Sequence, residues 1–167
     1  MKNLRFIALA LVFCILFLCG CAEDEPDAYS LLVDLMLGVN EEPGNNGYLY
    51  SSKASEGDVE YLPGDILVTL YGEKYLDSWS EMVEECAIFL SARDVCEIAV
   101  FKCYSRSDTA LVTTMLFERA DELKVALRHT EWEEQSGEIS IEINGKYLLF
   151  ALTHRSEELS RDFKSLV

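Results

Sequence analysis

The chain is poor in basic residues and in histidine, and it lacks the short motifs that mark common catalytic and metal sites. Its 14 lysines and arginines stand against 30 aspartates and glutamates, which gives a formal charge of −16 at neutral pH. This balance argues against nucleic-acid binding, which depends on neutralising phosphates, and against adhesion to anionic lipids through a basic patch. The sequence contains no Cys-x-x-Cys, His-x-x-x-His or His-Glu-x-x-His, no Gly-x-Ser-x-Gly elbow and no glycine-rich phosphate loop. We therefore predict no cofactor, no metal and no enzyme activity.

The first 20 residues form a targeting segment. Lys2 and Arg5 precede an unbroken apolar run of 14 residues, 6–19. A membrane-spanning helix needs about 20 such residues, so the run is too short for an ordinary anchor and typical of a signal sequence. An uncleaved short anchor and an ordinary secretory signal remain the alternatives.

The run ends in Leu18-Cys19-Gly20-Cys21, which resembles the lipobox of bacterial lipoprotein signals. In those signals a peptidase recognises the residues at the positions of Leu18, Cys19 and Gly20. The thiol at the position of Cys21 receives a diacylglyceryl group, and cleavage makes that cysteine the new N-terminus. Cys19 departs from the usual Ala, Ser or Thr, although it is also small. The resemblance implies a lipid anchor of two or three acyl chains on the extracytoplasmic face of the cell membrane.

Residues 21–27 then read as an acidic tether, and residues 28–167 as one folded domain. Without the leader, 147 residues remain, with 12 bases and 30 acids. A chain of about this length buries a substantial hydrophobic core. Anionic lipids repel the acids of the tether, which helps to keep the domain clear of the bilayer.

Three cysteines fall within the expected domain, namely Cys86, Cys96 and Cys103. An odd number leaves at least one free thiol unless a partner supplies another. Cys96 and Cys103 bracket a strand-like segment that spans roughly 23 Å, beyond the reach of a disulfide. A Cys86–Cys96 bond stays open, and three small buried side chains are the favoured interpretation.

The first half of the domain predicts two helices and little strand. Asp27 is placed to cap a helix that continues to Val39, with leucines at helical spacing. Residues 40–64 are rich in glycine, asparagine, serine and acids, and predict a long connection with one short strand at residues 48–50. Residues 65–75 predict a short helix or turn.

The second half predicts two hairpins and two helices. Residues 86–90 and 95–104 are apolar runs joined by a short polar loop, and the second is apolar on both faces, as expected of a central strand. Ser105-x-x-Asp108 has the form of a capping box for a helix that ends at Arg128. Residues 156–166 predict a terminal helix capped by Ser156.

The segment 138–153 carries the strongest structural signal. Ile139, Ile141 and Ile143 alternate with polar residues, and Asn144-Gly145 predicts a type I′ turn, which would set Ile143 opposite Lys146. The isoleucine face then needs a helix to cover it, and the helix ending at Arg128 is the natural cover. Together the elements predict an α+β fold: a single two-layer domain in which helices pack on an antiparallel sheet of about four strands in two hairpins.

Two of these segments carry a family resemblance. Glu-Ile-Ala-Val-Phe-Lys at residues 97–102 and Gly-Lys-Tyr at the start of 145–150, with Leu-Tyr-Gly at 70–72, resemble lipoproteins of Gram-positive anaerobes that carry domain-of-unknown-function family 4358. The resemblance covers residues 65–153. It implies a surface lipoprotein. The family has no assigned activity, so no residue role carries over.

The remaining candidate residues are aromatic, acidic and histidine side chains. Tyr48, Tyr50 and Tyr61 lie in or beside the long connection and form a candidate contact surface, with core coverage as the equal alternative. Glutamates cluster at residues 81–85 and 131–134, where solvated acidic faces are favoured over a catalytic carboxylate pair. His129 falls at a helix end, where a cation suits the helix dipole, and His154 ends a strand.

These observations favour a non-enzymatic, membrane-anchored binding or interaction module of the cell envelope. Its partner would be an envelope protein or ligand. The alternative is a lipid-anchored hydrolase of wall or sugar polymers that uses a carboxylate pair. A solute-capturing component of a transport system ranks lower, because the domain is small for a two-lobed binding protein.

Overall fold

The computed structural model describes residues 25–39, 47–134 and 136–167, which fold around one antiparallel sheet with the strand order β1-β2-β3-β5-β4. The strands are β1 (Gly47–Ser51), β2 (Val83–Ser91), β3 (Glu97–Cys103), β4 (Glu138–Asn144) and β5 (Tyr147–Thr153). The helices in the described part of the chain are α2 (Ala28–Gly38), α3 (Gly64–Tyr71), α4 (Leu76–Met82), α5 (Thr109–Leu127) and α6 (Ser156–Leu166), with a 3₁₀ turn, Glu73–Tyr75, before α4. The predicted α+β class is confirmed.

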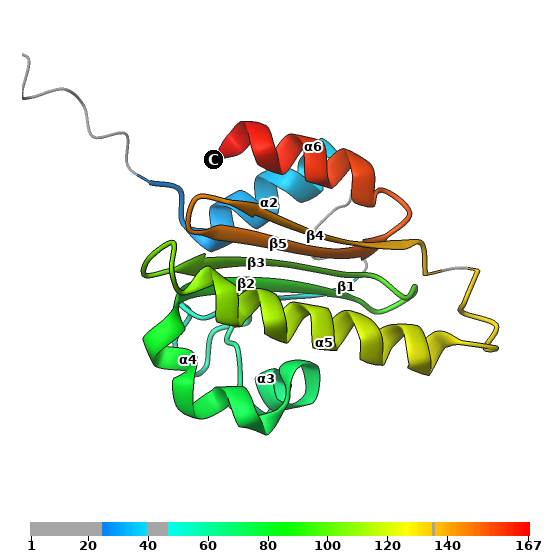
Figure 1. Ribbon diagram of the computed structural model, residues 1–167, viewed down its shortest axis with the longest axis horizontal. Coiled ribbons are helices and arrows are strands. Elements are labelled where there is room, and N and C mark those ends of the chain that lie inside the picture. Colours follow the sequence, from blue (N-terminus) through cyan, green and yellow to red (C-terminus); the bar gives the residue numbers. More distant parts are fainter. Residues whose placement is uncertain (1–24, 40–46, 135) are drawn as a thin grey trace, which may run out of the picture.

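Helices cover both faces of the sheet (Figure 1). Helices α3, α4 and α5 lie on one face, whereas α2 and α6 lie together on the other. The prediction had two layers and about four strands, and the structure has three layers and five strands. The added layer follows from the central strands, because β3 and β5 are buried along their whole length and need cover on both sides.

Several local predictions are confirmed. Asp27 caps α2, since its Oδ1 accepts a hydrogen bond of 2.8 Å from the Ser30 amide. The short strand expected at residues 48–50 is β1, which pairs with β2. Helix α5 covers the isoleucine face of β4, where Val112, Met115 and Leu116 share a core with Leu148 and Phe150.

The predicted register of the last hairpin is wrong by two residues, because the turn lies one residue further along the chain than expected. Asn144 pairs with Tyr147 and Ile143 with Leu148, so the turn residues are Gly145 and Lys146. Gly145 has φ of 61°, and Lys146 is not among the described residues with positive φ. This is the pattern of a type II′ turn, in which glycine occupies the first central position. The Asn144 side chain instead donates a hydrogen bond of 2.7 Å to the Val167 carbonyl, just past the end of α6.

Two predicted helix caps are also corrected. Helix α5 begins at Thr109, one turn later than expected, and its cap position is Asp108. The Ser105 amide and hydroxyl donate to Asp108 Oδ2 at 2.9 and 2.7 Å, so the acid's half of the predicted capping box forms in the turn before the helix. Ser156 lies inside α6 as its first residue, and its cap position is Arg155. Helix α4 had no counterpart among the predictions.

Candidate functional site: cavities around strand β4

Among the described residues, three cavities open around the start of β4. One of about 490 Å³ lies between β4 and α6, one of about 500 Å³ lies between β4 and the C-terminal end of α5, and one of about 310 Å³ lies at the N-terminal end of α6. Glu138, the first residue of β4, lines all three. Cavities of this size are within the range of small-molecule sites.

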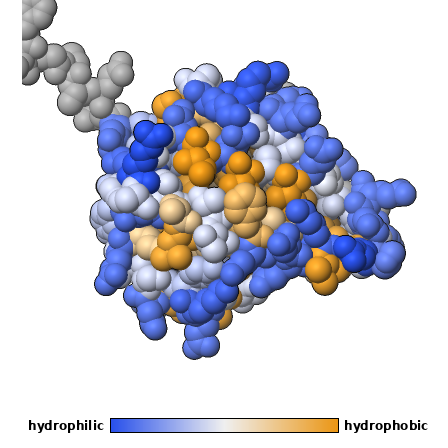
Figure 2. Space-filling model, viewed as in Figure 1, coloured by the Kyte–Doolittle hydropathy of each residue, from blue (hydrophilic) through white to orange (hydrophobic). Residues whose placement is uncertain are grey.

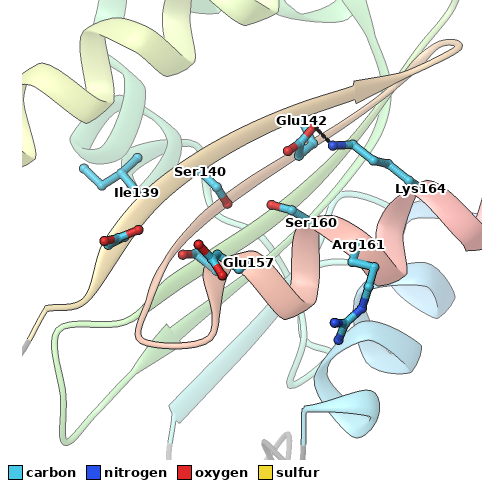
Figure 3. Close-up of a pocket in the computed structure, with 9 residues that line it drawn as sticks. Ile139, Ser140, Glu142, Glu157, Ser160, Arg161 and Lys164 are labelled. Carbon is cyan, nitrogen blue, oxygen red and sulfur yellow. Dashed lines mark ion pairs between the residues drawn. The ribbon is translucent and has the colours of Figure 1, made fainter.

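Strand β4 supplies one wall of the cavity between β4 and α6, because its side chains alternate between the two faces of the sheet. Ile139 and Ile141 pack towards the core under α5, so Ser140 and Glu142 face α6. Helix α6 supplies the other wall with residues three to four positions apart, while its Leu159 and Phe163 are buried against the sheet. Figure 3 shows this arrangement; the lining residues are Glu138, Ile139, Ser140, Glu142, Ser156, Glu157, Ser160, Arg161 and Lys164.

Some polar groups of this cavity form ion pairs, and others have no hydrogen-bond partner among the described residues. Lys164 Nζ lies 2.8 Å from Glu142 Oε2 and closes one end of the cavity with an ion pair. The hydroxyl oxygens of Ser140 and Ser160 are buried and have no hydrogen-bond partner in the described part of the chain. Figure 3 shows the two hydroxyls pointing towards each other across the gap between β4 and α6, with Glu157 beside them. Buried hydroxyls without partners are rare in folded proteins and call for an explanation.

Some of the groups that line the other two cavities have partners among the described residues. In the cavity beside α5, Glu133 Oε2 accepts a hydrogen bond of 2.7 Å from the His129 amide, and the Ser136 hydroxyl donates to the Glu133 carbonyl at 3.2 Å. In the smallest cavity, Arg155 Nη2 lies 2.6 Å from Glu158 Oε2. His154 lines this smallest cavity and His129 lines none of the three, so the two histidines do not line one site.

The predicted tyrosine surface lies at the opposite edge of the sheet. Tyr48 and Tyr50 point to one side of β1 and stack with ring centroids 6.4 Å apart, and Tyr48 is 62% exposed. Tyr61 is half-buried, and its backbone forms a parallel bridge with Ser51 at the end of β1. The structure therefore brings Tyr48 and Tyr50 together and sets Tyr61 beside their strand. Tyr50 also packs against the core, as the alternative interpretation expects, and the contact surface stays a prediction.

The two acidic clusters do not form a carboxylate pair across a cavity. Glu131, Glu133 and Glu134 are exposed on a turn. Glu84 and Glu85, expected to be solvated, instead contact lysines: Glu85 is only 7% exposed, accepts a hydrogen bond of 3.1 Å from the Ala28 amide, and lies 3.2 Å from Lys53 Nζ.

This lysine–glutamate network marks the end of the sheet where the chain enters the fold. Glu25 Oε2 lies 2.6 Å from Lys146 Nζ and 3.8 Å from the buried Lys102 Nζ. The hydrogen bond from Lys146 lowers the pKa of the Glu25 carboxyl. Lys102 pairs with Tyr147 and Glu97 with Leu152 in the sheet, so the network lies at one end of β3 and β5 and Glu138 lies at the other.

Cys86 and Cys103 are buried free thiols, in agreement with the favoured interpretation. Burial raises the pKa of each thiol from 9.0 to about 12, so both are protonated at neutral pH. Cys96 is half-buried in the loop before β3. The lipobox residues Leu18, Cys19, Gly20 and Cys21 lie outside the described residues.

Apolar side chains also gather on one face of the molecule. Figure 2 shows them over β4 and α5, with polar side chains around them. Ile143 on β4 and Leu111, Phe117 and Val125 on α5 are exposed. No helix within residues 25–39, 47–134 and 136–167 is long and apolar enough to cross a membrane, and these residues contain no group of three or more ligating side chains that could hold a metal ion.

The cavity residues were not identified from sequence. Ser140 and Glu142 were visible as the polar half of the alternation in β4, but α6 was not expected on that face of the sheet. Comparison of the chain with protein-family models, with curated proteins and with solved structures finds no match.

Proposed function

We propose that the chain is a membrane-anchored lipoprotein whose α+β domain is a non-enzymatic binding module of the cell envelope. The observation that carries the proposal is that the two ends of the strands differ: the chain enters the fold at one end, and the cavities open at the other. The network around Glu25, where the tether joins the fold, lies at one end of β3 and β5, and the Glu138 cavities lie at the other. A domain tethered at Cys21 would present these cavities away from the bilayer.

The anchor is tested by replacing the acylated residue. We expect Cys21→Ala to move the protein from the membrane fraction to the soluble fraction, because it removes the thiol that carries the acyl chains. Cys96→Ala is the matched control and should stay with the membrane. A Cys21→Ala protein that still fractionates fully with membranes would exclude a lipid anchor at this residue.

The binding role is tested by in-cell crosslinking of the lipidated protein, affinity capture and mass spectrometry. One dominant envelope partner would support an interaction module. Loss of that partner on replacement of Tyr48 and Tyr50 by serine, with no loss on Tyr104→Ser, would assign the contact to the edge of the sheet at β1. Tyr104 is a fair control because it is also exposed.

A carboxylate-pair hydrolase remains the second candidate, since Glu138, Glu142 and Glu157 line one cavity. Release of reducing ends from cell-wall polymer by the purified full chain, abolished by Glu157→Gln, would replace the binding proposal. Glu122→Gln is the control, because Glu122 is exposed on α5, outside the three cavities.

A further inference from the structure

The cavity between β4 and α6 contains hydrogen-bonding groups that the described part of the fold leaves unused. The Ser140 and Ser160 hydroxyl oxygens are buried without a partner, and Ser160 as a whole is only 9% exposed. Both face into the cavity (Figure 3). A buried hydroxyl without a partner costs free energy, so the fold gains when a ligand or solvent group reaches both of them.

The charges of the cavity are also unbalanced. Lys164 is paired with Glu142 at 2.8 Å, and Arg161 Nε lies 3.5 Å from Asp162. Arg161 points away from the two serine hydroxyls in Figure 3. Glu138 and Glu157 form no ion pair with any other described residue. Two carboxylates that accept hydrogen bonds therefore border two hydroxyls that can also accept them.

We propose that this cavity binds a primary ammonium group. An ammonium carries three donors, no acceptor and one positive charge, which matches the Ser140 and Ser160 hydroxyls together with the carboxylate of Glu157 beside them. A neutral polyol would satisfy the hydroxyls and leave the charge uncompensated. The cavity volume, about 490 Å³, accommodates the amine together with the residue or sugar that bears it.

Two sources of this chemistry are a lysine-type side chain on a peptide and an amino sugar. The inference rests on the proposed function, because it names the ligand chemistry of a binding module. It stands apart from the tyrosine surface, which lies at the other edge of the sheet.

The test is a titration of the ¹⁵N-labelled full chain with amine probes in non-ionic detergent. Binding is monitored by NMR through the chemical shifts of the backbone amides. The probes are Nα-acetyl-lysine methylamide and glucosamine. Each is compared with the same compound acetylated on its primary amine, which makes that group neutral. We expect the amines to shift the amides of Ser140, Glu157 and Ser160, and the acetylated probes to bind at least about tenfold more weakly. The stronger of the two amines identifies the source.

Two variants locate the site. Glu157→Gln should weaken the affinity for the amine at least about tenfold. Glu122→Gln, an equal change in charge on α5, should leave this affinity unchanged. Ser160→Ala should weaken binding while the apparent melting temperature stays equal or rises, because it removes an unsatisfied buried hydroxyl. That combination separates loss of a ligand contact from loss of the fold.

Three outcomes would overturn the proposal: no shift at these amides with either amine, equal binding of amine and acetylated probe, or an unchanged affinity in Glu157→Gln. Each leaves the proposed function intact if crosslinking still captures an envelope partner. If crosslinking fails while the amine binds at this cavity, the partner-binding role fails and the ammonium site stands.

Discussion

The thiols of Cys86 and Cys103 couple the stability of the fold to alkaline pH. Both lie in the core beneath α3, α4 and α5, and burial raises the pKa of each from 9.0 to about 12. In the unfolded chain the same thiols ionise near their ordinary pKa. The folded state therefore keeps two protons that the unfolded state loses between about pH 9 and pH 12, and stability falls as the pH rises through that window.

We expect the free energy of unfolding to drop by about 1.4 kcal/mol per thiol between pH 8 and pH 10. Urea unfolding of the full chain in reducing buffer, followed by tryptophan fluorescence, measures this. A Cys86→Ala/Cys103→Ala variant has no such thiols and should lose about 3 kcal/mol less over the same interval. Parallel pH profiles of the two proteins would contradict the assignment.

At the same scale, charged residues show the limit of prediction from sequence. Glu97 and Lys102 belong to a segment with a strand-like pattern, Glu85 directly precedes another such segment, and the side chains of all three are buried. Each is compensated by a partner far along the chain: Arg119 donates to Glu97 Oε2 at 3.1 and 2.6 Å. A buried ion pair depends on which elements meet. The sequence pattern indicated the strands, and the partners appeared only with the fold.

Among the elements, the loop that leads into β4 depends on one glycine. Gly137 has φ of 70°, and a Cβ there would lie 2.3 Å from the His154 amide nitrogen and the Thr153 carbonyl carbon. These are backbone atoms of the neighbouring strand end, which have little room to shift. The same residue lines two of the three cavities, so the close approach also positions Glu138.

We expect Gly137→Ala to destabilise the protein by roughly 1–3 kcal/mol, since alanine strains this backbone conformation and collides with β5. Gly64→Ala is the matched control: Gly64 begins α3, and no atom lies within 4 Å of the added methyl group. Urea unfolding should leave Gly64→Ala close to the parent. Equal urea midpoints for the two variants would show that the backbone at the end of β5 accommodates the added methyl group without loss of stability.

Element prediction succeeded where the signal was local. The capping by Asp27, the isoleucine alternation of β4 and the apolar run of β3 each lie within a few residues, and α2, β4 and β3 were predicted from them. The turn register failed because Asn144 has two uses in such a sequence: it favours type I′ turns, and here it hydrogen-bonds beyond the end of α6. Helix α4 has seven residues and no side-chain cap, so it left no comparable local signal.

At the scale of the whole molecule, the described residues form a hydrophobic core on each face of the sheet. The double-faced burial of β3 indicated that cover was needed on both sides, but not that α2 and α6 would meet on one face. The candidate cavity arises where α6 contacts β4, at the edge of the sheet. Strand β4 and α6 are separated only by β5 in the sequence, but a site between them could not be predicted before it was known which face of the sheet α6 covers.

The proposed anchor also gives the domain an orientation relative to the bilayer. Cys21 and Glu25 are four residues apart and so at most roughly 14 Å apart. Glu25 contacts Lys146 at one end of the sheet, and the seven-residue β3 extends roughly 23 Å towards the cavities. The amide of Ser107, in the connection that follows β3, should therefore lie nearer the bilayer than that of Arg93, in the hairpin at the other end.

We expect the lipidated full chain, in bilayer discs containing a gadolinium-chelating lipid, to show stronger relaxation enhancement at Ser107 than at Arg93, because the enhancement falls steeply with distance. The Cys21→Ala protein provides the control, since without its acyl chains it should lose the difference. Equal enhancement at both ends would mean that the tethered domain tumbles freely. Stronger enhancement at Arg93 would turn the cavities towards the membrane and remove the observation that carries the proposed function.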